Sequence, residues 1–331
     1  MKRRKRMIAV LLSLLLLLPC LSACSREPRE EKVTVVCTVF PLYDWAREII
    51  GDSEGAEAVL LIGNGTDAHS YQPSAEDILR IRRAAVMVYV GGESDAWIEE
   101  ALAGDAERDR QSLRLYDTQG VTLRQIAEES VGSDCDEDCH EEGHSHAHGG
   151  AETDEHIWLS LGNAAACVRA MTEALCAKDE DNAETYRSNA EEYLARLHTV
   201  KSSYEAFAKE IQGETLLFAD RFPFVYLAEE CGMRYVAAFR GCTTEADADP
   251  DTVIRLARTV DEQGLRTIFV TESSDGALAE AVRRATAAKD QHIVALDSLQ
   301  SVTAADREAG VTYLSVMEKN LEILRQSLLP E

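Results

Sequence analysis

The chain has 331 residues, of which 45% are hydrophobic, and its formal net charge at pH 7 is -25. This length exceeds what one hydrophobic core usually supports, so we expect two domains. A strongly acidic surface repels phosphate groups, and the sequence has no basic stripe with interleaved aromatic residues, which excludes nucleic acid as a partner.

The amino terminus is typical of a secretory signal. Its first six residues carry five positive charges ahead of an apolar run at 7–18, which is shorter than the roughly 20 residues that a membrane-spanning helix needs. Residues 21–24 read LSAC and resemble a bacterial lipobox. The resemblance implies a signal peptide over 1–23, lipidation of Cys24 and a tether over 24–32. An ordinary cleaved signal without a lipid is the alternative.

After the tether, short β-rich runs alternate with stretches whose apolar residues have helical spacing. Strands are predicted at 33–40, 58–62, 86–90 and 113–116, and helices at 43–50, 75–83 and 94–102. This alternation favours a parallel sheet covered by helices. We therefore predict an α/β lobe over 33–178.

One stretch of this lobe breaks the order, because residues 125–168 include eleven Asp and Glu residues and no Lys or Arg. Its centre, 134–150, has almost nothing apolar to bury, so we predict a mobile loop. The loop contains two cysteines and four of the eight histidines, namely Cys135, Cys139, His140, His144, His146 and His148. Imidazole and thiolate suit zinc, copper or nickel, so we predict an auxiliary, weak metal site. A solvated acidic linker is the alternative.

A long helix is predicted next, because apolar residues are spaced alternately four and three apart over 181–212, without Gly or Pro. The stripe consists of Tyr186, Ala190, Tyr193, Leu197, Val200, Tyr204, Phe207 and Ile211. Such a helix would be about 45 to 50 Å long, enough to span two lobes. We assign a linking helix to 179–212. A coiled-coil partner for the stripe is the alternative.

The alternation of strands and helices resumes after this helix. Strands are predicted at 216–219, 235–239, 267–271 and 293–296, and helices near 223–231, 251–263, 276–288 and 306–328. The same argument gives a second α/β lobe over 213–331. The fold class is therefore α/β, with two parallel-sheet lobes joined by one long rigid helix.

Two histidines stand in more ordered contexts than those of the loop. His69 lies in GNGTDAHSYQPSAEDI and His156 in TDEHIWLS, and each follows a turn-rich stretch and precedes a predicted helix. His69 follows the second strand, and ligands of open parallel sheets gather outside the strand ends. A lone histidine is more often structural than a ligand, so position alone leaves both roles open.

Four features together resemble the zinc-binding subunits of bacterial ABC transporters. They are GTDAHSYQPSAEDI, GGESDAWIEE, the acidic His-rich loop leading into DEHIWLS, and the long middle helix. The resemblance implies a metal-type periplasmic-binding-protein fold that captures Zn2+ outside the cytoplasm and delivers it to a permease and its ATPase. It also implies a monomer, lipid-anchored through Cys24 at the outer face of the bacterial cell membrane, that is not an enzyme.

The resemblance implies that His69 and His156 bind the metal. Ala68, Glu155 and Leu161 stand where the family often has Pro, and these changes leave the two ligands untouched.

The second lobe departs further from the family. The family places a His or Glu three residues before the Phe of an FxYxA pattern, and here that position is Arg221. Arginine cannot bind a metal, because it stays protonated. The remaining candidates are Asp275, which we rank first, then Glu272, and Asp220 at a strand end. We expect Arg221 to point away or to pair with one of these acids.

Two other functions stay open. The loss of a third histidine favours a manganese or iron carrier of the same class, since Mn2+ prefers oxygen-rich sites, whereas the His-rich loop favours zinc. An extracellular zinc hydrolase would need an open metal position and a general base, which two histidines with Glu272 could mimic.

Overall fold

A computed structural model describes residues 32–103, 109–126, 153–239 and 249–329. The predicted signal peptide, Cys24 and the whole loop 134–150 lie outside the described residues, so the predictions made for them stay predictions. Val33–Glu331 forms one compact unit. Among the described residues, no helix combines the length and the apolar character needed to cross a membrane.

The first sheet contains four parallel strands in the order β2-β1-β3-β4. Their bounds are β1 Val33–Cys37, β2 Ala56–Leu60, β3 Val86–Tyr89 and β4 Gln111–Arg114. Its helices are α2 Phe40–Ile50, α3 Ala75–Arg83, α4 Ala96–Ala103 and α5 Leu161–Lys178. Alternate residues of β1 and β3 face opposite sides of the sheet, one set packing with α2 and α5 and the other with α3 and α4.

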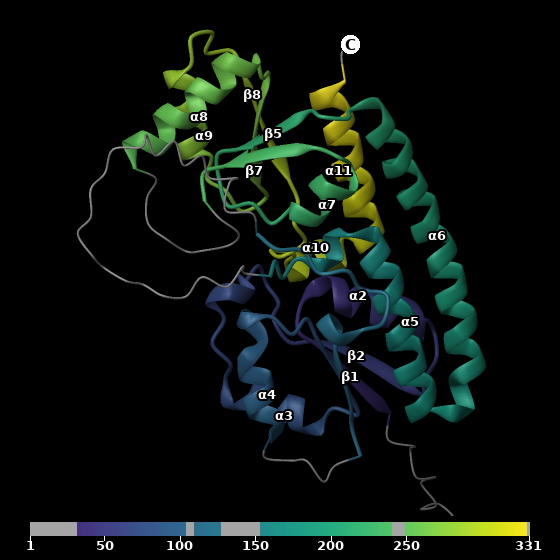
Figure 1. Ribbon diagram of the computed structural model, residues 1–331. Coiled ribbons are helices and arrows are strands. Elements are labelled where there is room, and N and C mark those ends of the chain that lie inside the picture. Colours follow the sequence, from purple (N-terminus) through teal and green to yellow (C-terminus); the bar gives the residue numbers. More distant parts are fainter. Residues whose placement is uncertain (1–31, 104–108, 127–152, 240–248, 330–331) are drawn as a thin grey trace, which may run out of the picture. The chain divides into compact units, whose positions relative to one another are not determined.

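The second sheet repeats this plan, with four parallel strands in the order β6-β5-β7-β8. The strands are β5 Thr215–Phe218, β6 Arg234–Ala237, β7 Thr267–Thr271 and β8 His292–Leu296. The helices are α7 Val225–Glu230, α8 Pro250–Gln263, α9 Ala277–Ala285, α10 Ala304–Glu308 and α11 Tyr313–Leu328. α8 and α9 cover one face of the sheet, and α7 and α11 pack on the other (Figure 1). Two parallel-sheet lobes are thereby confirmed.

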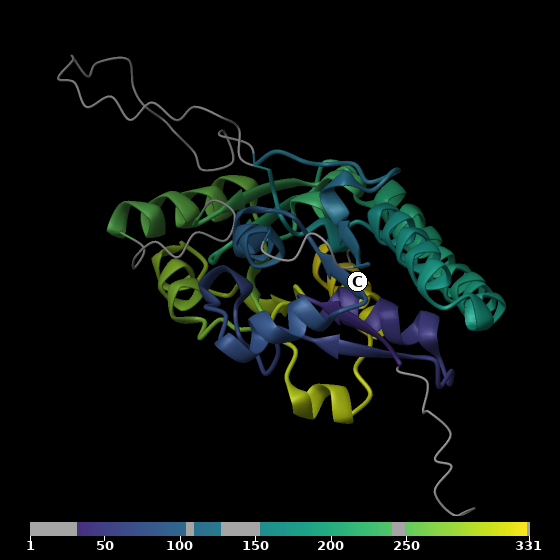
Figure 2. The same cartoon turned by 90° about the horizontal axis from the view of Figure 1, so that it is seen from below.

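The predicted linking helix is α6, Ala183–Glu210, whose 28 residues span about 42 Å. All eight residues of the predicted stripe are buried. The helix packs against α2 and α5 of the first lobe and against α11 of the second, and Figures 1 and 2 both show it lying beside α5. The stripe belongs to a hydrophobic cluster that includes residues of both sheets, so the lobes provide the packing surface and no coiled-coil partner is required.

The single helix predicted over 306–328 is wrong. The chain forms α10 and α11 instead, with Gly310 between them at φ 85°. This left-handed backbone suits glycine, which has no Cβ to clash. Thr312 then starts α11 through a capping box with Ser315.

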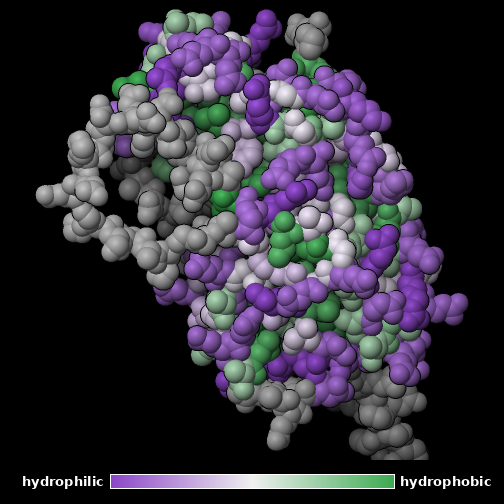
Figure 3. Space-filling model, in the orientation of Figure 1, coloured by the Kyte–Doolittle hydropathy of each residue, from purple (hydrophilic) through white to green (hydrophobic). Residues whose placement is uncertain are grey.

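The visible surface is mostly hydrophilic (Figure 3). Among the described residues, three large hydrophobic side chains are exposed, those of Leu79, Leu123 and Ile254. They lie on separate elements or loops, and scattered residues of this kind are normal on a monomer.

Asp44 is a buried acid where α2 meets α11. Its carboxylate accepts the backbone N–H of Tyr313 at 2.8 Å. Burial raises the pKa of Asp44 to about 6, against the lowering effect of that hydrogen bond. The ordinary Asp pKa of about 3.9 applies to the unfolded chain. Because the folded-state pKa is the higher one, the contribution of Asp44 to stability falls as the pH rises from about 4 to 6 and stays low above.

We therefore expect Asp44→Asn to raise the free energy of unfolding at pH 7.5 by about 1–3 kcal/mol. Asparagine keeps an oxygen for the Tyr313 N–H but removes the buried charge. Urea denaturation at pH 4.5 and 7.5 measures the effect, which should be smaller at pH 4.5. The exposed Asp52 is the control, where the same substitution should change stability by less than about 0.5 kcal/mol. A less stable Asp44→Asn protein at pH 7.5 would contradict the expectation.

Candidate metal site

His69 lies in η2, Ala68–Ser70, a short turn between β2 and α3. Asp67 caps this turn, since its Oδ1 accepts the backbone N–H of His69 at 2.9 Å. The ring Nδ1 of His69 is 2.8 Å from the hydroxyl of Ser94, which precedes α4. The side chain of His69 is 17% exposed. Asp67 thus holds the backbone of His69 and Ser94 contacts its ring, which solvent can still reach.

His156 is buried and is held by its neighbour Asp154. Asp154 Oδ1 accepts the backbone N–H of His156 at 2.8 Å and lies 3.0 Å from its Nδ1. A carboxylate only accepts hydrogen bonds, so the ring proton sits on Nδ1 and the lone pair of the neutral ring on Nε2. Metal-binding histidines commonly have this arrangement. The Tyr116 and Tyr226 hydroxyls donate to the Asp154 carbonyl, which fixes the segment further.

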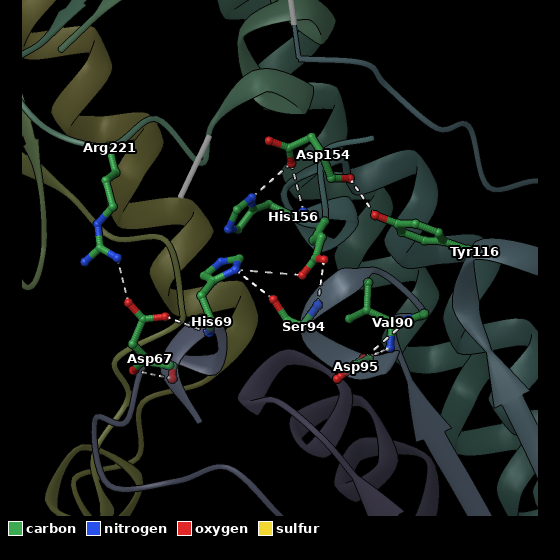
Figure 4. Close-up of polar contacts among 12 residues, drawn as sticks. Asp67, His69, Val90, Ser94, Asp95, Tyr116, Asp154, His156 and Arg221 are labelled. Carbon is green, nitrogen blue, oxygen red and sulfur yellow. Dashed lines mark hydrogen bonds and ion pairs between the residues drawn. The ribbon is translucent and has the colours of Figure 1, made fainter. Parts of the chain in front are cut away.

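The two rings face each other (Figure 4), with centroids 5.5 Å apart and planes tilted by 49°. The structure thus brings together the two histidines that the sequence singled out from distant segments. Neutral imidazole suits zinc and other late transition metals.

Asp220 and Glu272, two of the predicted acids of the second lobe, are engaged in local hydrogen bonds. Asp220 Oδ2 accepts the N–H and O–H of Thr271, at 3.2 and 2.8 Å, while its Oδ1 accepts the Arg221 backbone N–H at 2.8 Å. Glu272 accepts the N–H and O–H of Ser298, each at 2.9 Å. Each carboxylate is thereby oriented by protein donors and keeps lone pairs that these hydrogen bonds do not use.

Asp275 is exposed, and its Oδ1 accepts the backbone N–H of Ala277 at 2.9 Å, at the start of α9. Asp275 precedes Gly276, the N-cap of α9, so this is a local turn contact of the kind that Asp side chains make with the backbone two residues on. Glu272 instead lines a small polar pocket. The two acids, which the sequence ranks with Asp275 first, thus lie in different surroundings.

The guanidinium of Arg221 reaches Asp67 in the first lobe, with 2.7 Å between Nη1 and Oδ2. The sequence predicted that Arg221 points away from the metal or pairs with Asp220, Glu272 or Asp275, and Asp67 was not among these candidates. Burial tends to raise the pKa of Asp67, but hydrogen bonds from Arg221 and from the His69 N–H outweigh it and lower the pKa. A cation of the second lobe is thereby paired with the residue that caps the His69 turn.

The pocket beside this ion pair is lined entirely by polar residues and one proline: Asp67, Arg221, Pro223, Thr271, Glu272, Ser273, Ser298, Gln300 and Ser301. Within the part of the chain that the structure describes, no three His, Cys, Asp or Glu side chains lie close enough together to hold a metal ion.

Glu155 is a residue beside the site whose role the sequence did not reveal. Its Oε1 accepts the backbone N–H of Ser94 at 2.9 Å, and its Oε2 is 3.9 Å from Nδ1 of His69. The sequence offered one signal for this role, since Glu155 directly precedes the candidate ligand His156. It was treated only as a departure from proline.

A family model described as "Zinc-uptake complex component A periplasmic" matches residues 35–327. The zinc-binding lipoprotein AdcA of Streptococcus pneumoniae (strain R6) is 30% identical over 328 residues, which cover 99% of this chain and 61% of AdcA. The chain thus spans about three fifths of that relative. The high-affinity zinc uptake system protein ZnuA of Bacillus subtilis is 27% identical over 305 residues, covering 92% of this chain and 90% of ZnuA.

Among solved structures, the Zn(II)-bound ZnuA-like domain of Streptococcus pneumoniae AdcA is similar to this chain. It has a TM-score of 0.71 and 26% sequence identity, and the match covers 90% of this chain and 99% of that domain. The likeness includes both lobes, which confirms the predicted fold class.

Proposed function

The chain belongs to the family of periplasmic zinc-uptake complex components A, and we propose that it captures zinc outside the cytoplasm and delivers it to an ABC-type permease and its ATPase. The observation that carries the proposal is the pair of facing imidazoles, His69 and His156, 5.5 Å apart between ring centroids. Both are nitrogen ligands of the kind that zinc prefers. The relatives at 30% and 27% identity are named for zinc, which supports zinc over manganese as the cargo.

For the remaining ligands we propose Glu272 first, with Asp220 and Asp275 behind it. Glu272 lines the pocket that also contains Asp67 and Arg221. Asp297 is a second acid near Glu272, and burial, followed by the charge of Glu272, raises the pKa of Asp297 to about 6. A divalent cation would relieve that repulsion. Glu272 would bind the ion through a lone pair that its hydrogen bonds from Ser298 leave unused, and water would complete the coordination.

We also propose that the protein is exported, anchored by a lipid on Cys24 and monomeric. For its domains we propose the boundaries that the sequence predicts. The surface in view, mostly hydrophilic, supports the monomer. The function of a carrier is to bind and release its ion, which needs no chemical reaction. We therefore propose that the zinc-loaded protein catalyses no hydrolysis.

A zinc titration tests this function. In isothermal calorimetry with a competing chelator, we expect one tight zinc site per chain and weaker binding of manganese. Deleting residues 134–150 should keep the tight site and remove weak ones, and the weak sites should fade below about pH 6.5, where free imidazole becomes protonated. Absence of a tight zinc site, or tighter manganese, would overturn the proposed function. Unchanged stoichiometry after the deletion would rule out only the auxiliary metal site.

A further inference from the structure

Two consecutive acidic residues serve different histidines. Asp154 lies 3.0 Å from Nδ1 of His156, the ring two residues further along the chain. Glu155 is directed to the other histidine, with its Oε2 3.9 Å from Nδ1 of His69. Each imidazole therefore has a carboxylate on its Nδ1 side, although the two rings come from different loops.

We propose that Glu155 is a positioning residue for zinc capture, which sets His69 in the tautomer that can bind the metal through Nε2. The proposal rests on the proposed function, because it takes His69 to be a zinc ligand. The carboxylate acts through Ser94 and through its charge, without touching the ion.

Ser94 alone does not decide which ring nitrogen of His69 carries the proton. Its hydroxyl lies 2.8 Å from Nδ1 (Figure 4), and a hydroxyl can donate to a ring nitrogen or accept from its N–H. The negative charge of Glu155 removes this ambiguity. A proton on Nδ1 is attracted by the carboxylate 3.9 Å away, whereas a lone pair there is repelled. With the proton on Nδ1, the lone pair lies on Nε2, as at His156.

The carboxylate of Glu155 is held close to His69 by its own contacts. Its Oε1 accepts the Ser94 backbone N–H at 2.9 Å, and the side chain is 16% exposed. It also lies directly against Gly92, where an added Cβ would be 2.3 Å from Oε1 and 2.4 Å from Cδ. The φ of Gly92 is -83°, which any residue adopts. An alanine at this position would therefore push the Glu155 side chain aside, because the atoms that it would meet all belong to that side chain.

The test compares Glu155→Gln and Gly92→Ala with the wild-type protein. Glutamine keeps an oxygen for the Ser94 N–H, but it has no charge and offers an amide N–H that favours a lone pair on Nδ1. In nitrogen-15 NMR spectra of the metal-free protein, His69 should carry its proton on Nδ1 in the wild type and lose that preference in Glu155→Gln. Zinc affinity should fall about 10- to 100-fold in both variants, as for other residues that orient metal ligands.

Glu93→Gln is the matched control, because Glu93 is an exposed carboxylate close to Ser94 in the sequence, and it should behave as the wild type. Wild-type zinc affinity in Glu155→Gln, with or without a changed tautomer, would overturn the inference while leaving zinc capture intact, provided that His69→Ala still weakens binding. If His69→Ala also leaves affinity unchanged, the proposed site itself fails. Should Gly92→Ala not fold, Glu155→Gln decides alone.

Discussion

His69→Ala and His156→Ala should each weaken zinc binding by about a hundredfold or more. Structural zinc sites bind with about 10–16 kcal/mol, so one of four ligands accounts for about 3 kcal/mol, which is a factor of about 100. His156 is only 2% exposed and already oriented by Asp154. Its loss therefore also removes a ligand that the protein holds in place before the metal binds. Competition with a chromophoric zinc chelator measures both affinities.

His198→Ala is the control for these variants. His198 is exposed on α6, away from the paired rings, and its removal should leave zinc affinity within a factor of two. Wild-type affinity in both His69→Ala and His156→Ala would show that the facing imidazoles are not the zinc site.

Arg221→His should tighten zinc at least tenfold relative to manganese. The family resemblance places Arg221 at a ligand position, and the structure pairs its guanidinium with Asp67 at 2.7 Å. A cation near a divalent ion costs about 4 kcal/mol per unit charge at 4 Å and an effective dielectric of about 20. Histidine would remove this repulsion and add a third imidazole, a ligand better suited to zinc than to manganese. Parallel zinc and manganese competition titrations give the ratio.

Arg221→Gln separates the two effects, because glutamine removes the charge without supplying an imidazole. Arg221→Gln should strengthen the binding of zinc and of manganese alike and leave the ratio of the two affinities unchanged. A zinc-to-manganese ratio that stays level or falls in Arg221→His would show that residue 221 does not occupy a ligand position in this chain.

The sequence by itself determined the fold class and the pair of histidines. Burial follows local periodicity, so the apolar stripe from Tyr186 to Ile211 was enough to predict α6, and the alternating strands and helices were enough to predict two parallel sheets. His69 and His156 could be selected because each belongs to a motif that resembles a known family. The break at Gly310 was missed, since the helical pattern of apolar residues continues on both sides of it.

Only the tertiary structure decided which polar side chains meet. Asp67 pairs with Arg221 across the two lobes, and Glu155 reaches His69 through Ser94 and the space left by Gly92. It also decided that Asp275 binds the backbone N–H of Ala277 while Glu272 lines the pocket. Such contacts depend on how loops at the ends of different strands are placed relative to each other. The packing of α2, α5 and α11 against α6 fixes that placement, and no local pattern of residues records it.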